Sequence, residues 1–293
     1  MTLPTTLRPR LAEPRILVAP GVYDALTASL AEMAGFEAVY LSGAAVAYTR
    51  LGRPDIGLST MSEMADTCAL IRDRIALPVI IDADTGFGNA LNAARTMRTY
   101  ERAGANALQV EDQTYPKRCG HLRDKALIPA PEMAGKVAAM ADARAHDTLL
   151  IARTDAIAVE GFDAAIGRAG AYVEAGADVL FIEAPESREQ LEAIARTFPA
   201  TPVMANMVEG GATPLASAAE LEAIGFSLVI FPGGVVRAVA RHAEDYYRSL
   251  HAHGSNEPFR ERMHDFIGLN AVLGTDAMLE EGRRYERGAP DAE

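Results

Sequence analysis

Short apolar runs alternate with segments of helical spacing along most of the chain, and this alternation restricts the fold more than any other feature of the sequence. Eight apolar runs predict strands, and these lie at Ile16–Ala19, Ala38–Leu41, Pro78–Asp82, Ala107–Glu111, Leu149–Arg153, Val179–Glu183, Pro202–Asn206 and Leu228–Phe231. The segments after them predict helices, at Asp24–Ala34, Ser62–Ile75, Ala90–Ala103, Glu132–Arg144, Asp163–Ala175, Arg188–Thr197, Ser217–Ile224 and Val235–His251. Each predicted strand is therefore followed by a predicted helix.

No linker interrupts these strand-then-helix units, and glycines such as Gly104 and Gly225 suit the left-handed position that ends a helix. We therefore predict an α/β fold with a single (β/α)8 TIM barrel domain over residues 1–293, rather than a doubly wound sheet with fewer strands. Residues 258–293 form a C-terminal extension, in which Pro258–Arg283 predicts additional helices. This extension is surplus to a barrel and is expected to pack against another subunit.

Charge and cysteine content narrow the classes of partner. The chain has 28 basic and 40 acidic side chains, which gives a formal net charge of −12. Net repulsion disfavours nucleic acid and acidic lipid, and the apolar runs are shorter than the roughly 20 residues that a membrane span requires. Met1–Arg15 lacks the apolar core of a secretory signal and the chain has two cysteines, so we expect a reducing, cytoplasmic location. A small anion remains a compatible partner if local cations bind it.

Acidic residues end two neighbouring strands, at the edge where a barrel builds its active site. Asp82 ends the third predicted strand, Asp84 follows it, and Glu111 ends the fourth. Strand alternation would align the two aspartates, and carboxylates at close range repel each other unless a cation neutralises them. Oxygen ligands without histidine or cysteine favour Mg²⁺, with Mn²⁺ as an alternative, and Mg²⁺ binds few carboxylates directly. The plainer interpretation is that the aspartates cap a loop or pair with Arg153.

Basic residues surround a cysteine in the long connection after the fourth predicted strand. The segment reads Lys117, Arg118, Cys119, Gly120 and His121. Nearby cations favour the thiolate, which suits a thiol that exchanges protons with a substrate, and we assign the cysteine and its basic neighbours as catalytic. A loop of about 20 residues exceeds the usual connection and often acts as a lid. The alternative is a solvated basic loop in which the cysteine is incidental.

Two arginines are the strongest predicted ligands for carboxylates. Arg153 ends the fifth predicted strand and Arg237 follows the eighth. A guanidinium binds a carboxylate through two parallel hydrogen bonds, whereas a lysine acts as a point charge. Arg237 has the alternative of lying on a helix surface.

Six motifs carry a resemblance to a known family. They are YLSG at 40–43, DADTGFG at 82–88, VEDQ at 110–113, KRCGH at 117–121, ARTDA at 152–156 and NMVEGGATP at 206–214. Together they resemble the isocitrate lyase and phosphoenolpyruvate mutase superfamily over about Val18 to Gly234. The cysteine of KRCGH is similar to the lyase branch, because mutases and decarboxylase-type members are expected to lack it. Within that branch, the sequence resembles lyases that act on 2-methylisocitrate, 2,3-dimethylmalate or other 2-alkylmalates.

This resemblance implies a barrel whose C-terminal helix is exchanged between subunits, in a homotetramer built as a dimer of dimers. It implies Mg²⁺ held by Asp84, with Asp82 and Glu111 in support. It also implies that the loop carrying Cys119 closes over the bound ligand. Substrate contacts carry over to Tyr40, Ser42, Gly43, Ala44, Asp55, Gly120, His121, Arg153, Glu183, Asn206 and Arg237.

The implied reaction cleaves a carbon–carbon bond in a 2-hydroxy di- or tricarboxylate. Loss of the C2 hydroxyl proton lets the bond between C2 and C3 break, which gives pyruvate or a related 2-oxo acid and a carboxylate enolate. Mg²⁺ stabilises the oxygens that become the 2-oxo acid, while Arg153 and His121 stabilise the enolate. Cys119 then donates the proton that quenches the enolate.

The base and the substrate stay open among several candidates. The base is Tyr40, Asp55 or a metal-bound hydroxide. Met263–Asn270 is apolar where the resemblance implies an arginine for a third carboxylate, so a 2-alkylmalate-type dicarboxylate is favoured over methylisocitrate. Alternative functions are decarboxylation or hydrolysis of oxaloacetate and, less favoured, phosphonomutase activity or metabolite binding without catalysis.

Overall fold

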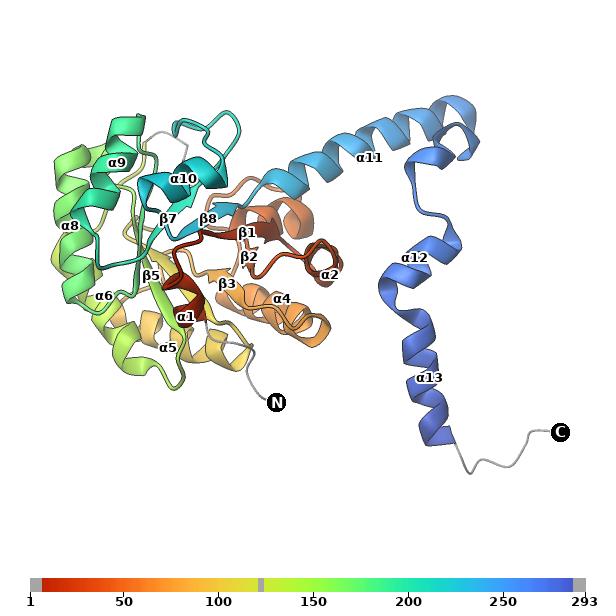
Figure 1. Ribbon diagram of the computed structural model, residues 1–293, viewed down its shortest axis with the longest axis horizontal. Helices are drawn as coiled ribbons and strands as arrows, with labels where there is room; N and C mark the ends of the chain where they lie inside the picture. Colours follow the sequence, from red (N-terminus) through yellow and green to blue (C-terminus); the bar gives the residue numbers. More distant parts are fainter. Residues whose placement is uncertain (1–6, 121–123, 287–293) are drawn as a thin grey trace. The chain divides into compact units, whose positions relative to one another are not determined.

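Eight parallel strands close into a barrel in the computed structural model, which describes residues 7–120 and 124–286. Their order around the barrel is their order in the sequence (Figure 1), and β1 pairs with β8 to close it, with Leu17 opposite Leu228. The strands are β1 (Leu17–Val22), β2 (Val39–Leu41), β3 (Val79–Asp82), β4 (Ala107–Glu111), β5 (Leu149–Thr154), β6 (Val179–Ile182), β7 (Val203–Asn206) and β8 (Leu228–Phe231). The predicted TIM barrel and all eight predicted strands are confirmed.

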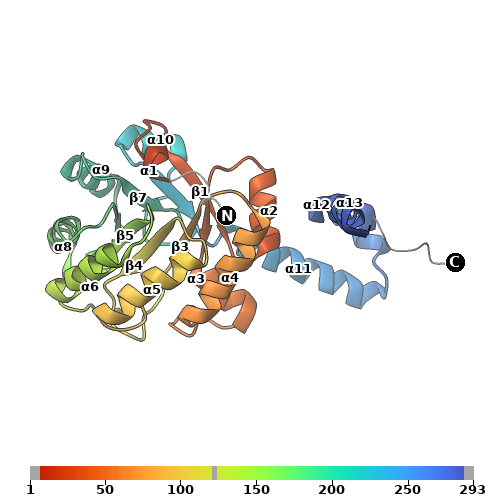
Figure 2. The same ribbon diagram turned by 90° about the horizontal axis from the view of Figure 1, so that it is seen from below.

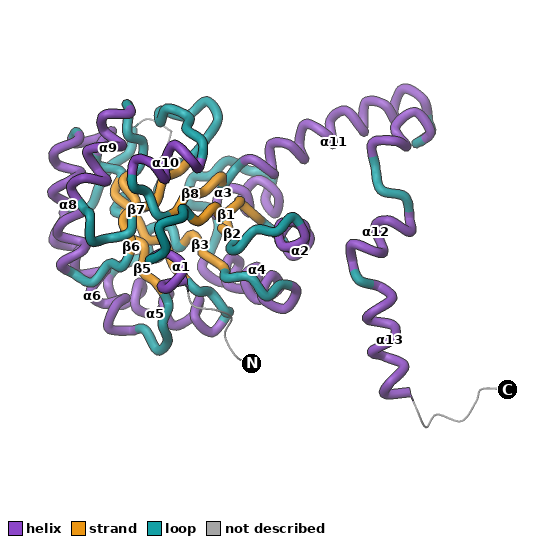
Figure 3. The backbone as a smooth tube through the Cα atoms, in the orientation of Figure 1, coloured by secondary structure: helices purple, strands orange, loops and turns teal. Residues whose placement is uncertain are grey.

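Helices cover the outside of this barrel, and Figure 3 shows them in purple around the orange strands. They are α1 (Leu7–Leu11), α2 (Ala25–Met33), α3 (Gly43–Val46), α4 (Met61–Arg74), α5 (Ala90–Arg102), α6 (Ala130–Ala143), α7 (Ile157–Glu160), α8 (Phe162–Glu174), α9 (Arg188–Thr197) and α10 (Ala218–Ile224). The chain then continues into α11 (Gly234–His253), most of which belongs to a second compact unit. The eight predicted helices are confirmed. The short helices α1, α3 and α7 were missed, since four or five residues are too few to show a helical period. Within the described chain, no helix combines the length and apolar character needed to cross a bilayer.

Alternate strand residues fill the interior of the barrel, as expected when side chains point in turn to either face. Leu17, Ile80, Ile151 and Phe181 belong to this inner cluster and are almost completely buried. The short helix α1 adds Leu7 and Leu11 to the same cluster, so it covers the amino end of the barrel. The core that supports the site is therefore built from both the strands and the N-terminal helix.

The outward-facing strand residues pack against the helices in two further clusters. Ile81 belongs to one cluster with Met64 and Ile71 of α4, while Val229 belongs to the other with Ile194 of α9. Strands buried on both faces are typical of parallel sheets, and Figure 2 shows the helical layer from a perpendicular direction. Gly104, which ends α5, has a φ of 94° as predicted for a left-handed helix end.

The chain forms two compact units, Met1–Val236 and Arg237–Glu293. The division falls inside α11, whereas the extension was expected to start at residue 258. The second unit contains most of α11, a 3₁₀ segment (Glu257–Arg262), α12 (Phe266–Leu273) and α13 (Thr275–Glu286), which confirms helices in the predicted extension. α12 has no buried residue, and its Phe266 is 85% exposed.

Candidate active site

The turn after β3 holds Asp82 and Asp84 at the carboxyl end of the barrel. β3 ends at Asp82, and Asp84 has a φ of 45°, a left-handed conformation that aspartate tolerates better than most residues. The two aspartates lie close together as predicted, with Asp84 N donating to Asp82 Oδ1 at 3.0 Å, but the turn brings them together rather than strand alternation, because the strand ends at Asp82. Other elements secure the turn: Glu111 N donates to Asp84 O at 2.9 Å, and Lys136 Nζ of α6 donates to Thr85 O at 3.2 Å.

A buried lysine joins Asp84 to Asp55. Lys117 Nζ lies 2.7 Å from Asp84 Oδ1 and 2.6 Å from Asp55 Oδ1, and none of these side chains is more than 9% exposed. Burial raises the pKa of Asp84 to about 6, although Lys117 opposes the rise. Burial also lowers the pKa of Lys117, but Asp84, Glu111 and Asp55 outweigh it and raise that pKa well above its usual value. Lys117 is therefore a constant cation among carboxylates.

Arg153 is the centre of a second group of charges. Its Nε and Nη2 donate to Asp155 Oδ2 and Oδ1 at 2.8 and 3.0 Å, and it lies 3.4 Å from Glu111 and 3.6 Å from Glu183. The guanidinium carbon stands 5.0 Å from the centre of the Phe181 ring. Burial raises the pKa of Glu111 far above its usual range, more than Arg153 lowers it. This group therefore still holds a carboxylate that its cations do not fully compensate.

Asp155 connects Arg153 to the loop that follows β4. Its Oδ1 lies 2.8 Å from Lys125 Nζ, and its backbone N–H donates to Asp112 Oδ1 at 3.0 Å. Burial raises the pKa of Asp155, but Arg153 and Lys125 more than offset this and bring it down to about 2. Lys125 Nζ also donates to the carbonyl of Gly120 at 2.5 Å.

The loop between β4 and α6 is anchored at its base and near its middle. Gln113 and Leu127 form an antiparallel bridge at the base, and the Gln113 side chain accepts from Arg118 N at 2.9 Å and donates to Arg118 O at 2.8 Å. Cys119 N donates to the carbonyl of Asp55 at 3.2 Å. The half-buried Cys119 therefore lies beside the Asp55–Lys117 contact.

Gly120 packs directly on the Arg153 group. A Cβ at this position would stand 2.4 Å from Arg153 Nη2 and 2.8 Å from Glu183 Cγ, so this close approach requires glycine. His121, which was predicted to touch the substrate, lies outside the described residues. The described part of the KRCGH motif thus meets both groups of charges at the carboxyl ends of the strands.

Tyr40 lies inside the mouth of the barrel. Its hydroxyl donates to Gln109 Oε1 at 2.5 Å, and Gln109 Nε2 is 3.4 Å from Asp82 Oδ1. Burial, assisted by Asp82, raises the pKa of Tyr40 well above its usual value. Tyr40 is therefore held protonated and poorly suited to accept a proton.

The segment after β2 provides a polar edge next to Asp82. Ser42 caps α3 by accepting from Ala45 N at 3.2 Å, and Gly43 and Ala44 follow it in the first turn. A Cβ on Gly43 would come within 3.0 Å of Asp82 Oδ2. Glycine therefore allows the backbone of this turn to lie close to that carboxylate oxygen.

The predicted substrate ligands from the last strands divide between the two units. Glu183 follows β6, is buried, and accepts from Asn206 Nδ2 of β7 at 3.2 Å. Both residues therefore join the Arg153 group. Arg237 lies in the first turn of α11 and belongs to the second compact unit.

The carboxylates at this rim fit a hard divalent cation. Burial raises the pKa of Asp84, and Glu111 Oε1 is buried without a hydrogen bond to any described residue. In the described chain, no three histidine, cysteine or acidic side chains surround one point closely enough to form a complete ligand set. Mg²⁺ suits such a site, because it keeps several waters and binds through one or two carboxylates.

Sequence reasoning missed Asp155 and Lys125, which link the two sides of the site. A usable signal was the scarcity of lysine. The chain has only three lysines, Lys117, Lys125 and Lys136, and all three side chains are buried near this rim or its supporting turn. Lysine is normally among the most exposed residues. In a chain whose few lysines are all buried, each lysine is therefore a candidate for a functional or structural role.

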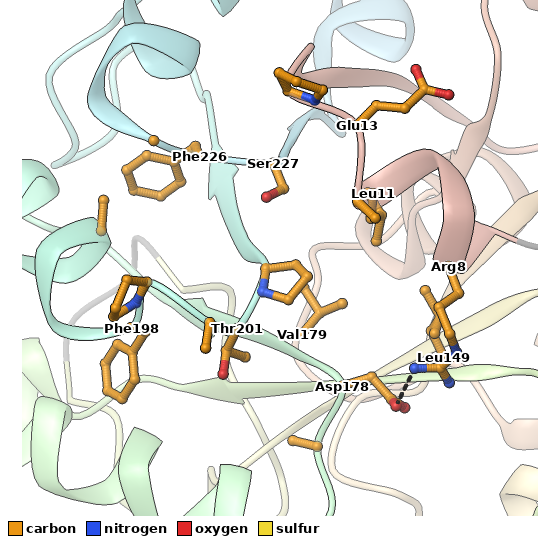
Figure 4. A pocket seen from close by; sticks show the side chains of 18 of the residues that line it. Arg8, Leu11, Glu13, Leu149, Asp178, Val179, Phe198, Thr201, Phe226 and Ser227 are labelled. Atoms are coloured by element: carbon orange, nitrogen blue, oxygen red, sulfur yellow. Dashed lines mark hydrogen bonds and ion pairs between the residues drawn. The ribbon is translucent and has the colours of Figure 1, made fainter.

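A cavity of about 610 Å³ lies at the other, amino end of the barrel (Figure 4). It is lined by residues such as Leu11 of α1, Leu149 and Ser227, and Arg8 at its edge pairs with Asp178 at 2.9 Å. None of the predicted site residues that the structure describes lines it. Barrel enzymes place their chemistry at the carboxyl ends of the strands, so we assign the active site to the opposite rim.

Sequence comparisons agree on one family. The profile of the family described as phosphoenolpyruvate phosphomutase matches residues 7–251. The chain is 40% identical over 289 residues to 2,3-dimethylmalate lyase of Eubacterium barkeri, covering 98% of this chain and 100% of that protein. It is 46% identical over 277 residues to 2-methylisocitrate lyase of Aeropyrum pernix, covering 92% and 89% respectively.

Solved structures give the same result. A crystal structure of 2,3-dimethylmalate lyase superposes with a TM-score of 0.91 at 35% identity, covering 98% of this chain and 97% of that one. An oxaloacetate acetylhydrolase bound to 3,3-difluorooxalacetate gives 0.88 at 32% identity, with 97% and 96% covered. A phosphonopyruvate hydrolase complex with oxalate and Mg²⁺ gives 0.86 at 30% identity, with 99% of each chain covered.

Proposed function

Because the chain belongs to the phosphoenolpyruvate mutase/isocitrate lyase superfamily and is a lyase of that family, we propose that it cleaves a 2-hydroxy di- or tricarboxylate between C2 and C3 with the help of Mg²⁺. The products are pyruvate or a related 2-oxo acid and a second carboxylate. The observation that carries this proposal is the seating of Cys119 and Gly120 on Asp55 and Arg153. It brings the backbone of the cysteine-containing segment against a guanidinium at a rim rich in carboxylates.

Substrate carboxylates bind to Arg153 and to the backbone of the segment Ser42–Ala44. Arg153 is held in place by Asp155 and Phe181, so its guanidinium is oriented before substrate arrives. Preorganised donors lose little entropy when the substrate binds, which favours both affinity and rate. Glu183 and Asn206 complete the pocket through their mutual hydrogen bond.

Asp84 would hold the metal, with Asp82 and Glu111 acting through water. When bound, Mg²⁺ supplies electrostatic stabilisation for the negative charge that develops on the substrate oxygens. The chain's own contribution is the set of buried carboxylates whose mutual repulsion is relieved by a cation. This arrangement supports Mg²⁺ as the cofactor, with Mn²⁺ as the alternative.

One proton moves from oxygen to carbon in the reaction. The C2 hydroxyl proton passes to a base, the C2–C3 bond breaks, and its electron pair becomes the enolate. Cys119 donates a proton to the enolate carbon, and the thiolate later recovers one, so protons balance overall. Between the two side chains considered as bases, Asp55 is favoured, because the Tyr40 hydroxyl is buried, donates to Gln109 and has a raised pKa.

A dicarboxylate of the 2-alkylmalate type is the favoured substrate. The segment Met263–Asn270 contains no arginine or lysine for a third carboxylate, and a relative that covers nearly the whole chain is named 2,3-dimethylmalate lyase. The 46% identity to a protein named 2-methylisocitrate lyase keeps the tricarboxylate as a second candidate. Hydrolysis or decarboxylation of oxaloacetate is the alternative reaction, favoured by the similarity to an oxaloacetate acetylhydrolase.

Pyruvate release separates these candidates. The protein is incubated with 2,3-dimethylmalate, 2-methylisocitrate or oxaloacetate, each with Mg²⁺ and with EDTA, and the co-product is identified. We expect Mg²⁺-dependent pyruvate and propionate from 2,3-dimethylmalate. Pyruvate with succinate from methylisocitrate alone would correct the substrate, and turnover of oxaloacetate alone would replace the lyase proposal by its alternative.

We also propose that the C-terminal helices pack on a second copy of the chain, within a homotetramer. α12 exposes Phe266 and Ile267, and in the same unit α11 with Phe259 lines an apolar cavity of about 490 Å³. Exposed apolar surface of this kind is typical of interfaces. Light scattering should report a tetramer for the wild type and a smaller species for Phe266→Glu. The cytoplasmic location and the exclusion of nucleic acid and membranes stay predictions.

A further inference from the structure

We propose that Lys125, together with Asp155, is a positioning pair that seats the Cys119–Gly120 segment on the substrate-binding arginine. The reaction outlined above uses Asp155 only to hold Arg153 and assigns no role to Lys125. The inference rests on the proposed function for its catalytic consequence, but its structural claim can be tested separately.

Asp155 is fixed by contacts to its side chain and to its backbone. Its carboxylate is fully buried and receives two hydrogen bonds from Arg153, at 2.8 and 3.0 Å, and an ion pair from Lys125 at 2.8 Å. Its own backbone N–H is held by Asp112. One fixed carboxylate therefore determines the positions of two cations at once.

Lys125 links Asp155 to the segment that carries Cys119. Its ammonium contacts Asp155 and the carbonyl of Gly120, at 2.8 and 2.5 Å, while the Cα of Gly120 lies against Arg153 and Glu183. Gly120 is thus held from two directions by groups that Asp155 orients. Because Cys119 precedes Gly120 directly, its position depends on the same contacts.

Lysine suits this task better than arginine. A compact ammonium with three donors can bind a carboxylate and a carbonyl from one point, whereas the planar guanidinium binds best to one flat partner. The Lys125 side chain is only 2% exposed, and burying an ammonium is costly unless it is fully paired. The chain has only three lysines, so the presence of one at this buried position indicates that an ammonium is required here.

The consequence is that the substrate-binding Arg153 and the proton donor Cys119 are positioned by the same contacts. If Arg153 and Gly120 share the same support, then the thiol is held at the rim in the geometry that also orients the guanidinium. Loss of Lys125 leaves Arg153 bound to Asp155 but frees the Gly120 carbonyl. The substitution should therefore loosen the Cys119 segment more than it disturbs binding of the substrate carboxylate.

The test measures alkylation of Cys119 by iodoacetamide in the full-length protein, with cleavage products resolved by mass spectrometry. Cys68 is completely buried and serves as an internal reference. We expect Lys125→Met to raise the alkylation rate of Cys119 about tenfold, as local opening becomes more frequent. The matched control is Lys136→Met, which removes another buried ammonium bound to a backbone carbonyl, that of Thr85, and should leave the rate within about twofold of wild type.

Kinetics provide a readout that a purely structural role would not reproduce. On whichever substrate the wild type turns over, Lys125→Met should lower kcat about 10- to 100-fold while KM changes less than about threefold. A second variant, Gly120→Ala, should raise alkylation in the same way, because its methyl group would displace the segment from Arg153. This variant keeps the proposal testable if Lys125→Met does not fold.

An alkylation rate within about twofold of wild type in the folded variant would overturn the proposal. So would a rise in KM with unchanged kcat, because that pattern places Lys125 in substrate binding alone. Failure of the proposed function is a different outcome: the wild type would then release no pyruvate from 2,3-dimethylmalate or from 2-methylisocitrate, whereas the alkylation result does not depend on turnover.

Discussion

The two ends of the barrel both carry ion pairs, but these differ in burial. At the carboxyl end, the side chains of Lys117, Asp84 and Arg153 are at most 9% exposed. At the amino end, Arg8 is 48% exposed and pairs with Asp147 and Asp178 near the cavity of Figure 4. Water screens the second group much more than the first.

Because of this difference, we expect substitutions at the carboxyl end to change activity more than stability, and substitutions at the amino end to do the reverse. Buried charges cost free energy when their desolvation exceeds their mutual attraction, and the carboxyl end gathers Asp55, Asp82, Asp84, Glu111, Asp155 and Glu183 against Lys117, Lys125 and Arg153. Such an excess of buried carboxylates fits the metal site proposed above, because a bound cation would relieve their mutual repulsion. The amino end has no comparable excess among the ion pairs named here and serves to hold α1 on the barrel.

The largest expected effect is on the thiol at the carboxyl end. Cys119→Ser should lower lyase turnover about 10²- to 10⁴-fold, the range typical of a lost general acid. Oxalate binding in the presence of Mg²⁺, followed by calorimetry, should stay within about threefold of wild type, because the substitution leaves Arg153 and the carboxylates intact. Full retained lyase activity would remove Cys119 from the proton-donor role.

Substitution of Asp84 should also reduce activity with little effect on stability. Asp84→Asn should reduce Mg²⁺-dependent turnover at least about 100-fold, since it removes the carboxylate proposed to hold the metal. The free energy of unfolding in urea should change by less than about 1 kcal/mol, because Lys117 keeps Asp55 as a partner and one buried charge is removed. A large loss of stability would assign Asp84 to the scaffold instead.

At the amino end we expect the reverse pattern. Asp178 accepts from Leu150 N at 2.8 Å and pairs with both Arg8 and Arg144. Asp178→Asn should therefore lower the free energy of unfolding by about 1 to 3 kcal/mol, while kcat and KM stay at wild-type values. Reduced turnover without reduced stability would contradict the division between the two ends.

The smallest effect is expected at Glu37, before β2. Arg10 and Arg15 lower its pKa to about 2, so the stability it contributes is present above its unfolded pKa and is lost as the pH falls through about 2. Its side chain is 41% exposed, so Glu37→Gln should cost only about 0.2 to 1 kcal/mol at neutral pH. Urea unfolding should show this cost shrinking in 0.5 M NaCl, because the Debye length there is only about 4 Å, compared with about 30 Å at 0.01 M salt. A cost that salt leaves unchanged would show that the pair behaves as a buried one.

The order of strands and helices was predictable because each unit carries its own local signal. Residues such as Val79–Ile81 read as a buried strand, and the glycine after α5 adopts the expected left-handed φ of 94°. The clustering of Asp82, Asp84 and Glu111 at one rim followed from the barrel itself, since all eight strands end there. The short helix α1 escaped notice, because Leu7 and Leu11 show their role only when placed against the barrel interior.

The sequence by itself determined the barrel and placed most of the candidate site residues at the carboxyl ends of its strands. Only the tertiary structure decided that Asp84 meets Lys117, that Asp155 joins Arg153 to Lys125, and that Gly120 rests on both Arg153 and Glu183. The physical reason lies in the range of the interactions. Hydrophobic period and helix ends are set by neighbours a few residues apart, whereas the charges of the site come from separate strands and one long loop, and their pairing exists only once the barrel has closed.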